Sequence, residues 1–169
     1  VDGASLDYTI TEFPFFSFYL ADLHPHVLAL PFITLVLGLG LNLFVSDEKL
    51  GFAWLRKYPL EVLAIALALG SLSFINTWDF PIVATIFVAL VLAKAYAESE
   101  GDIFRSLLPA LYVVAPVLAG AIIFFIPFHA TLETQASGIL PLGEVATRPL
   151  LFFIIWGLFS VLCGSFLIK

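Results

Sequence analysis

Apolar residues fill five long blocks of the chain, and polar residues are largely confined to the stretches between them. The blocks cover about residues 26–45, 60–76, 81–97, 107–126 and 149–168. A membrane-spanning helix needs about 20 mostly apolar residues, so we expect each block to be a transmembrane helix. Ser71 and Ser73 make the second block the weakest of the five.

Prolines mark the places where several of these helices are expected to begin. They are Pro25, Pro59, Pro81 and Pro149. The first turn of a helix tolerates proline because its missing N–H would have no partner there. Pro116 falls inside the fourth block instead, and we expect it to kink that helix.

The composition supports an integral membrane protein. Hydrophobic residues make up 62% of the 169 residues and charged residues 12%, whereas soluble domains carry about 25% charged residues. We therefore predict an all-α, polytopic transmembrane bundle, with one domain over residues 1–169. Residue 1 is Val and the chain contains no methionine, so we expect an internal fragment of a larger membrane protein.

Charge placement predicts the orientation of the bundle. One side of the membrane receives Lys49, Arg56, Lys57, Lys94, Arg105 and Lys169, and the other receives only Arg148. Lysine and arginine favour the cytoplasmic side. We therefore place the chain in the plasma (cytoplasmic) membrane with residues 1–25, 76–80 and 127–148 extracytoplasmic. The net charge of −6 argues against a nucleic-acid partner, which requires a basic face.

Ionisable and amide side chains gather on the predicted outer side, and the first group precedes the first span. If Pro25 is the first helical residue, His24 is the N-cap, and the free N–H groups of that turn favour a phosphate or carboxylate. Asp22 and His26 are four residues apart, so on a helix they share a face and can hydrogen-bond. The alternative is that Asp22 caps a helix and the histidines are merely solvated. The cost of ionisable groups near a membrane favours a functional role.

A second outer group is the stretch INTWDFP at residues 75–81. Trp78 suits an interface anchor, and the simplest role for Asp79 is an N-cap. If this turn lies beside the first group, Asp22 and Asp79 become candidates for a general base or for ligands of a divalent metal ion. Asp22 and His26 are the candidate metal pair.

The third outer segment, residues 128–149, is long enough for a lid or binding loop. Gln135 and Arg148 are polar side chains through which this loop would contact a ligand. Arg148 is the only outer cation and is a candidate partner for a phosphate. Pairing with Glu144 is the alternative.

Three separated motifs resemble one known family. EFPFFSFYLADLHPHVLALPF at residues 12–32, NTWDFP at residues 76–81 and QASG at residues 135–138 are similar to the YYY family of large membrane proteins, a domain of unknown function. The likeness covers nearly the whole chain. More distantly, Asp22, His24 and Pro25 resemble the D-x-H-P-P element of protein O-mannosyltransferases, with His26 in place of the last proline. Those C-type glycosyltransferases take a sugar from a polyprenyl-phosphate donor at the outer membrane face.

The resemblance implies a glycosyltransferase-like membrane protein that acts on a lipid-phosphate-linked sugar at the extracytoplasmic face. Asp22 and Asp79 are then the candidate catalytic residues. The candidate substrate-binding residues are Glu12, His24, His26, Asn76, Trp78, Gln135 and Arg148. The expected partners are membrane lipid and a polyprenyl-phosphate sugar.

A second hypothesis is a non-catalytic membrane subunit that scaffolds a larger complex with other membrane subunits. Its histidines would ligate a pigment or a metal, although His24, His26 and His129 lie at the ends of predicted spans, which counts against a pigment. Transport is a third hypothesis. It predicts charged or broken helices at the membrane midplane. Only Asn42 and Pro116 fit this prediction, and they fit it weakly.

Overall fold

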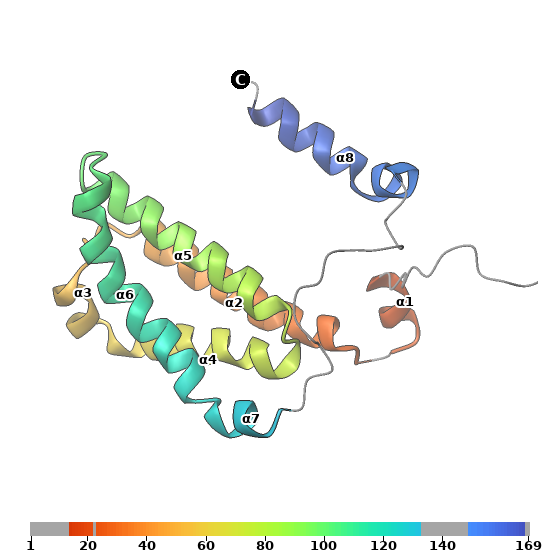
Figure 1. Ribbon diagram of the computed structural model, residues 1–169, viewed down its shortest axis with the longest axis horizontal. Coiled ribbons are helices and arrows are strands. Elements are labelled where there is room, and N and C mark those ends of the chain that lie inside the picture. The colour runs from red at the N-terminus through yellow and green to blue at the C-terminus, as the bar shows by residue number, and fades with distance from the viewer. Residues whose placement is uncertain (1–13, 22, 133–148, 168–169) are drawn as a thin grey trace, which may run out of the picture. The chain divides into compact units, whose positions relative to one another are not determined.

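The computed structural model describes residues 14–21, 23–132 and 149–167. Every regular element in these residues is a helix, which confirms the all-helical class. The helices are α1 Pro14–Tyr19, α2 Pro25–Val45, α3 Phe52–Lys57, α4 Pro59–Ile75, α5 Asp79–Glu98, α6 Ile103–Ile123, α7 Ile126–Thr131 and α8 Pro149–Leu167 (Figure 1). The chain divides into two units, residues 12–132 and residues 1–11 with 133–169. In the second unit the structure describes only α8.

Four long helices of the first unit pack into a bundle. Helix α2 contacts α4 and α5, α6 contacts the same two helices, and α4 also contacts α5. The links at residues 76–78 and 99–102 are short, and short links make neighbouring helices antiparallel. Consecutive long helices therefore run in opposite directions, as Figure 1 shows.

This alternation gives the bundle two ends. The start of α2, the link at residues 76–78 and α7 lie at one end, which we call the α4–α5 end. The segment 46–58, which contains α3, and the link at residues 99–102 lie at the opposite, α5–α6 end. The α4–α5 end corresponds to the side that the sequence predicts to be extracytoplasmic.

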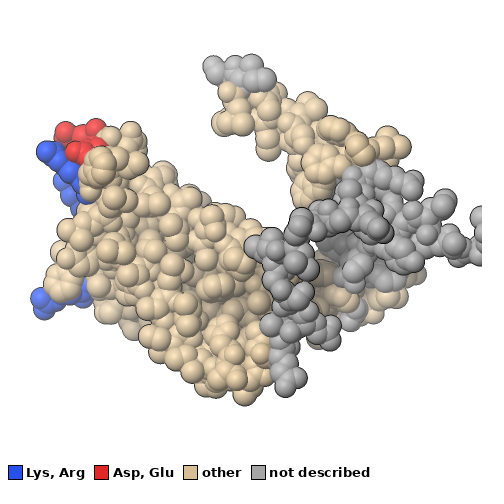
Figure 2. All heavy atoms as spheres, viewed as in Figure 1, with Lys and Arg blue, Asp and Glu red and all other residues tan. Residues whose placement is uncertain are grey.

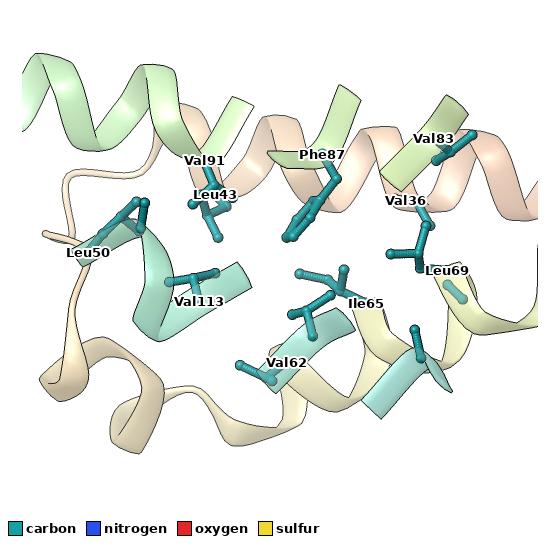
Figure 3. Close-up of a cluster of buried hydrophobic side chains, with 14 of the residues drawn as sticks. Val36, Leu43, Leu50, Val62, Ile65, Leu69, Val83, Phe87, Val91 and Val113 are labelled. Atoms are coloured by element: carbon teal, nitrogen blue, oxygen red, sulfur yellow. The ribbon is translucent and has the colours of Figure 1, made fainter. Parts of the chain in front are cut away.

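The core between the four helices is apolar and closely packed. Phe87 of α5 and Ile65 of α4 point toward each other near its centre, with Val36 and Leu43 of α2 and Val113 of α6 around them (Figure 3). Each of these five side chains is almost completely buried. Large apolar side chains also cover the outside of the bundle, such as Leu60, Leu111 and Ile122. A surface of this kind is suited to lipid.

Three of the bundle helices are long and apolar enough to cross a membrane: Pro25–Val45, Asp79–Glu98 and Ile103–Ile123. Helix α4 is shorter, with 17 residues, and covers only roughly 25 Å at about 1.5 Å per residue. The sequence predicted the second block to be the weakest, and this helix agrees. The prediction of a single domain over all 169 residues stays a prediction.

The predicted start of the fourth span is wrong by four residues. Helix α6 begins at Ile103 rather than near 107, because the Asp102 carboxylate caps it by accepting hydrogen bonds from the N–H groups of Phe104 and Arg105, at 3.0 and 3.1 Å. The helix ends at Ile123, and α7 follows as a separate turn. Pro116 lies inside α6, as its position predicted.

Removing this cap is expected to destabilise the bundle. Asp102→Ala leaves two N–H groups of the first turn without their side-chain acceptor, and the loss of such a cap costs about 1 kcal/mol. Asp102→Asn keeps an acceptor oxygen and serves as the matched control. Thermal unfolding in detergent should therefore separate the alanine variant from both the wild type and the asparagine variant. Equal unfolding temperatures for all three would contradict the capping role.

Candidate functional site

Acidic and basic side chains lie almost entirely at one end of the described bundle. Those at the α5–α6 end are Asp47, Glu48, Lys49, Arg56, Lys57, Glu61, Lys94, Glu98, Glu100, Asp102 and Arg105. Figure 2 shows red and blue atoms at this end and none on the visible described surface elsewhere. Within the described residues, Asp79 is the single Asp, Glu, Lys or Arg at the opposite end of the bundle. Its surroundings are therefore the candidate functional site.

The Asp79 carboxylate is oriented by a neighbouring amide. Asn76 is the C-cap residue of α4, and its Nδ2 donates a hydrogen bond to Asp79 Oδ2 at 2.9 Å. The sequence suggested that Asp79 caps α5, and this is wrong. Helix α5 already begins at Asp79, its N-cap residue is Trp78, and no side-chain capping bond forms. A carboxylate has about four acceptor positions, so Asp79 retains acceptor capacity for a ligand.

Ser73 and His129 form a contact that sequence reasoning did not find. Ser73 is buried near the end of α4, and His129 Nε2 lies 3.4 Å from its Oγ. Thr77 donates from its Oγ1 to the carbonyl oxygen of Ser73 at 3.1 Å, which ties this pair to the link that carries Asn76. The Ser73 hydroxyl also donates to the carbonyl oxygen of Gly70 at 2.6 Å, so its partner within the helix gave no signal in the sequence for the contact with His129.

The two histidines at the start of α2 lie together at the same end of the bundle. His24 is the N-cap residue of α2 with Pro25 at the start of the helix, as predicted. The His24 and His26 rings are 4.7 Å apart between centroids. In the described part of the chain, no three His, Cys, Asp or Glu side chains are grouped closely enough to hold a metal ion. The histidine pair and Asp79 therefore do not form a single metal centre.

Comparison with known proteins identifies the family. Residues 4–169 match the model of DUF2298, described as an uncharacterized membrane protein family. The chain belongs to this family. It is thus a membrane domain of unknown function, as the resemblance to the YYY family implied. No curated protein and no solved structure matches the chain, so the likeness to protein O-mannosyltransferases rests on its D-x-H-P residues alone.

Several predicted site residues of this DUF2298 chain lie outside the described residues. They are Glu12, Asp22, Gln135 and Arg148. Their roles stay predictions, and so does the metal pair of Asp22 and His26. Trp78 is described and is 73% exposed, which suits either an interface anchor or a ligand contact. The plasma-membrane location and the outward orientation also stay predictions.

The α5–α6 end of the DUF2298 bundle is held by ion pairs. Lys94 is buried, and its Nζ lies 3.3 Å from Glu98 Oε1 and also binds the carbonyl oxygen of Ser46. On the surface, Lys57 Nζ pairs with Glu48 Oε1 at 2.7 Å. The hydrogen bond from Lys57 lowers the pKa of Glu48, and the bond to Glu48 raises the pKa of Lys57. These contacts give the α5–α6 end a structural role.

Proposed function

We propose that this DUF2298 chain is part of a glycosyltransferase-like membrane protein that acts on a lipid-phosphate-linked sugar. The site is the α4–α5 end, which we place on the extracytoplasmic side. One observation carries the proposal: the described bundle has a single carboxylate at that end, held by Asn76 at 2.9 Å, where the other polar groups are hydroxyl, amide and imidazole. Such an arrangement suits proton transfer at a membrane surface.

In this proposal the acceptor hydroxyl attacks the anomeric carbon of the sugar. The bond from that carbon to the lipid phosphate breaks, and the phosphate leaves with the electron pair. Asp79 takes the proton of the hydroxyl as general base, and Asn76 fixes the orientation of its carboxylate.

The phosphate of the donor is assigned to the start of α2. His24 and His26 lie there, and the dipole of a long helix favours an anion at its N-terminal end. We further propose that Asp22 and Glu12 complete the site. A divalent metal ion held by Asp22 and His26 would neutralise the leaving phosphate.

The test is sugar transfer by the full-length protein. Asp79→Asn keeps the size of the side chain and its acceptor oxygen but removes the base, so turnover is expected to fall at least about 100-fold. Asn76→Ala leaves the carboxylate in place but unoriented, and a loss in turnover of at least about 10-fold is expected, because a hydrogen bond to a charged group contributes about 1.5–3 kcal/mol. Transfer from a radiolabelled polyprenyl-phosphate sugar into product measures both variants.

Glu100→Gln is the matched control, because it removes one carboxylate at the α5–α6 end and should leave turnover unchanged. If the Asp79 variant transfers sugar at the wild-type rate, the catalytic assignment is wrong. A full-length protein that transfers no sugar but purifies in a stoichiometric complex, with or without the Asp79 carboxylate, would support the scaffolding hypothesis instead.

A further inference from the structure

A small cavity lies between the end of α2, the segment that contains α3 and the start of α4. Its volume is about 170 Å³, below the roughly 300–1,000 Å³ of typical small-molecule sites. The described residues that line it are Asn42, Leu43, Ser46, Glu48, Trp54, Tyr58 and Glu61. A cavity of this size with a polar and aromatic lining suits one small polar group.

The ionisable groups of this lining are acidic. Glu48 and Glu61 contribute two carboxylates, and no described lysine, arginine or histidine lines the cavity. Glu48 is already paired with Lys57, with 2.7 Å between Oε1 and Nζ. The Glu61 carboxylate, in contrast, forms no ion pair or hydrogen bond with a described residue. The cavity therefore has a carboxylate to offer to a ligand that brings a positive charge.

The protein already binds one ammonium group at this cavity. Lys57 Nζ donates to Glu48 and lies 5.1 Å from the centre of the Tyr58 ring. An ammonium group is well held when a carboxylate and an aromatic face meet around it. The ring of Trp54 lies 5.6 Å from that of Tyr58. Trp54 and Glu61 line the same cavity and offer the same combination, with no cation of the described chain bound to either.

An unused donor sets a second requirement for the ligand. Trp54 is only 3% exposed, and its indole Nε1–H, a donor only, forms no hydrogen bond with a described residue. Nε1 is nevertheless not closed off from solvent, and Trp54 lines the cavity. The side-chain amide of Asn42 is also unbonded among the described residues. A ligand that satisfies this lining brings an oxygen acceptor together with its positive charge.

An aminoethyl phosphate group has both features, because two carbon atoms join its primary ammonium to the phosphate-ester oxygen. The group occurs in the headgroup of phosphatidylethanolamine and in soluble phosphoethanolamine. The cavity lies at the end of an apolar bundle, and exposed apolar side chains stand on the same elements, Phe52 on α3 and Leu60 on α4. Arg56 and Lys57 in the last turn of α3 supply positive charge for the phosphate. These surroundings favour the lipid.

We propose that this cavity binds the headgroup of phosphatidylethanolamine. The ammonium donates to the Glu61 carboxylate, and the phosphate-ester oxygens accept from the N–H groups of Trp54 and Asn42. This lipid site lies at the α5–α6 end, opposite the proposed site of sugar transfer, and it does not depend on that function.

The test titrates the purified full-length protein with phosphatidylethanolamine or phosphatidylglycerol of the same acyl chains and counts bound lipids by native mass spectrometry. Phosphatidylglycerol has no ammonium group, so the wild type should bind phosphatidylethanolamine more tightly. Glu61→Gln should reduce this preference about 10-fold, the effect of losing one hydrogen bond between charged groups. Glu100→Gln is the matched control, because it removes a carboxylate at the same end that does not line the cavity, and it should keep the preference.

A second variant tests the indole donor. Trp54→Phe keeps an aromatic ring in the core but removes the N–H, and it should weaken phosphatidylethanolamine binding about 5-fold. The unfolding temperature shows whether this variant is folded, and if it is not, Glu61→Gln decides alone. A folded Trp54→Phe variant that binds the lipid as the wild type does would overturn the assignment.

Three further results would refute the inference. The wild type could bind both lipids equally, or Glu61→Gln could keep the wild-type preference. Glu61→Gln and Glu100→Gln could also lower the preference alike, which would mean that overall charge and not the cavity discriminates between the lipids. Glu61 stands in the first turn of α4, where it also interacts favourably with the helix dipole; loss of that role alone would change the unfolding temperature and leave the lipid preference intact.

Soluble phosphoethanolamine distinguishes the two sources of the group. It should compete with the lipid only weakly, because it lacks the acyl chains that hold the lipid on the apolar surface. Tight binding of soluble phosphoethanolamine that requires Glu61, without selective binding of phosphatidylethanolamine, would assign the cavity to a soluble amine and overturn the lipid proposal.

Discussion

Gly70→Val is expected to destabilise the bundle by at least about 3 kcal/mol, the upper part of the range for overpacked cores. A Cβ atom at Gly70 would lie 2.6 Å from the carbonyl oxygen of Ala121 and 2.7 Å from the ring of Phe125. The first of these is a backbone atom of α6, so the steric clash can be relieved only if α4 and α6 move apart. Since α4 and α6 each contact α5 as well, that movement disturbs the shared core.

Gly38→Val is the matched control for this prediction. It makes the same chemical change in a helix of the same bundle, but apart from its chain neighbours and the nearby backbone of α2, no atom lies within 4 Å of a Cβ at Gly38. Its effect should stay within about 0.5 kcal/mol, as for surface substitutions. Gly120→Ala should fall between the two, because its Cβ would lie 3.0 Å from that of Ala66. Denaturant unfolding in mixed micelles measures all three, and equal losses at Gly70 and Gly38 would contradict the close approach of α4 and α6.

The helices were predictable because their lengths follow from composition. Long apolar blocks that begin near a proline predicted the first residues of α2, α4, α5 and α8 to within two residues. The break after Ile123 was not predictable in this way, because the apolar run continues through Phe124 and Phe125. Hydropathy cannot tell a continuous helix from one that ends and restarts when both sides of the break are apolar.

The site was predictable only in its outline. Alternating spans put the start of α2 and the α4–α5 link at the same end, and the structure agrees. The bond from Asn76 to Asp79 was not predictable, because it depends on how the chain turns between two helices. The contact between Ser73 and His129 joins residues 56 positions apart. It accompanies the packing of Phe125 on Gly70 and of Phe128 on Phe74, and no local pattern encodes such packing.

Lys94→Met is also expected to destabilise the bundle strongly, lowering its free energy of unfolding by about 3 kcal/mol. The side chain of Lys94 is 6% exposed and that of Glu98 20%, so removal of the ammonium leaves a largely buried carboxylate. Breaking a buried pair in this way costs about 3–5 kcal/mol, and the partial exposure of Glu98 lowers the expected value within that range. The C-terminal end of α2 is affected too, since Lys94 binds the carbonyl oxygen of Ser46.

A double-mutant cycle distinguishes the ion pair from simple loss of packing. Glu98→Gln keeps an acceptor for the N–H of Leu50, which Glu98 binds at 2.9 Å, and in combination with Lys94→Met it removes the uncompensated charge. The double variant should therefore be more stable than the sum of the single losses predicts. The exposed pair of Lys57 and Glu48 is the control, and the same exchanges there should change unfolding very little. If the losses at Lys94 and Glu98 simply add, the two side chains contribute separately, and the end of α2 is held by the bonds of Lys94 to backbone oxygens rather than by the ion pair.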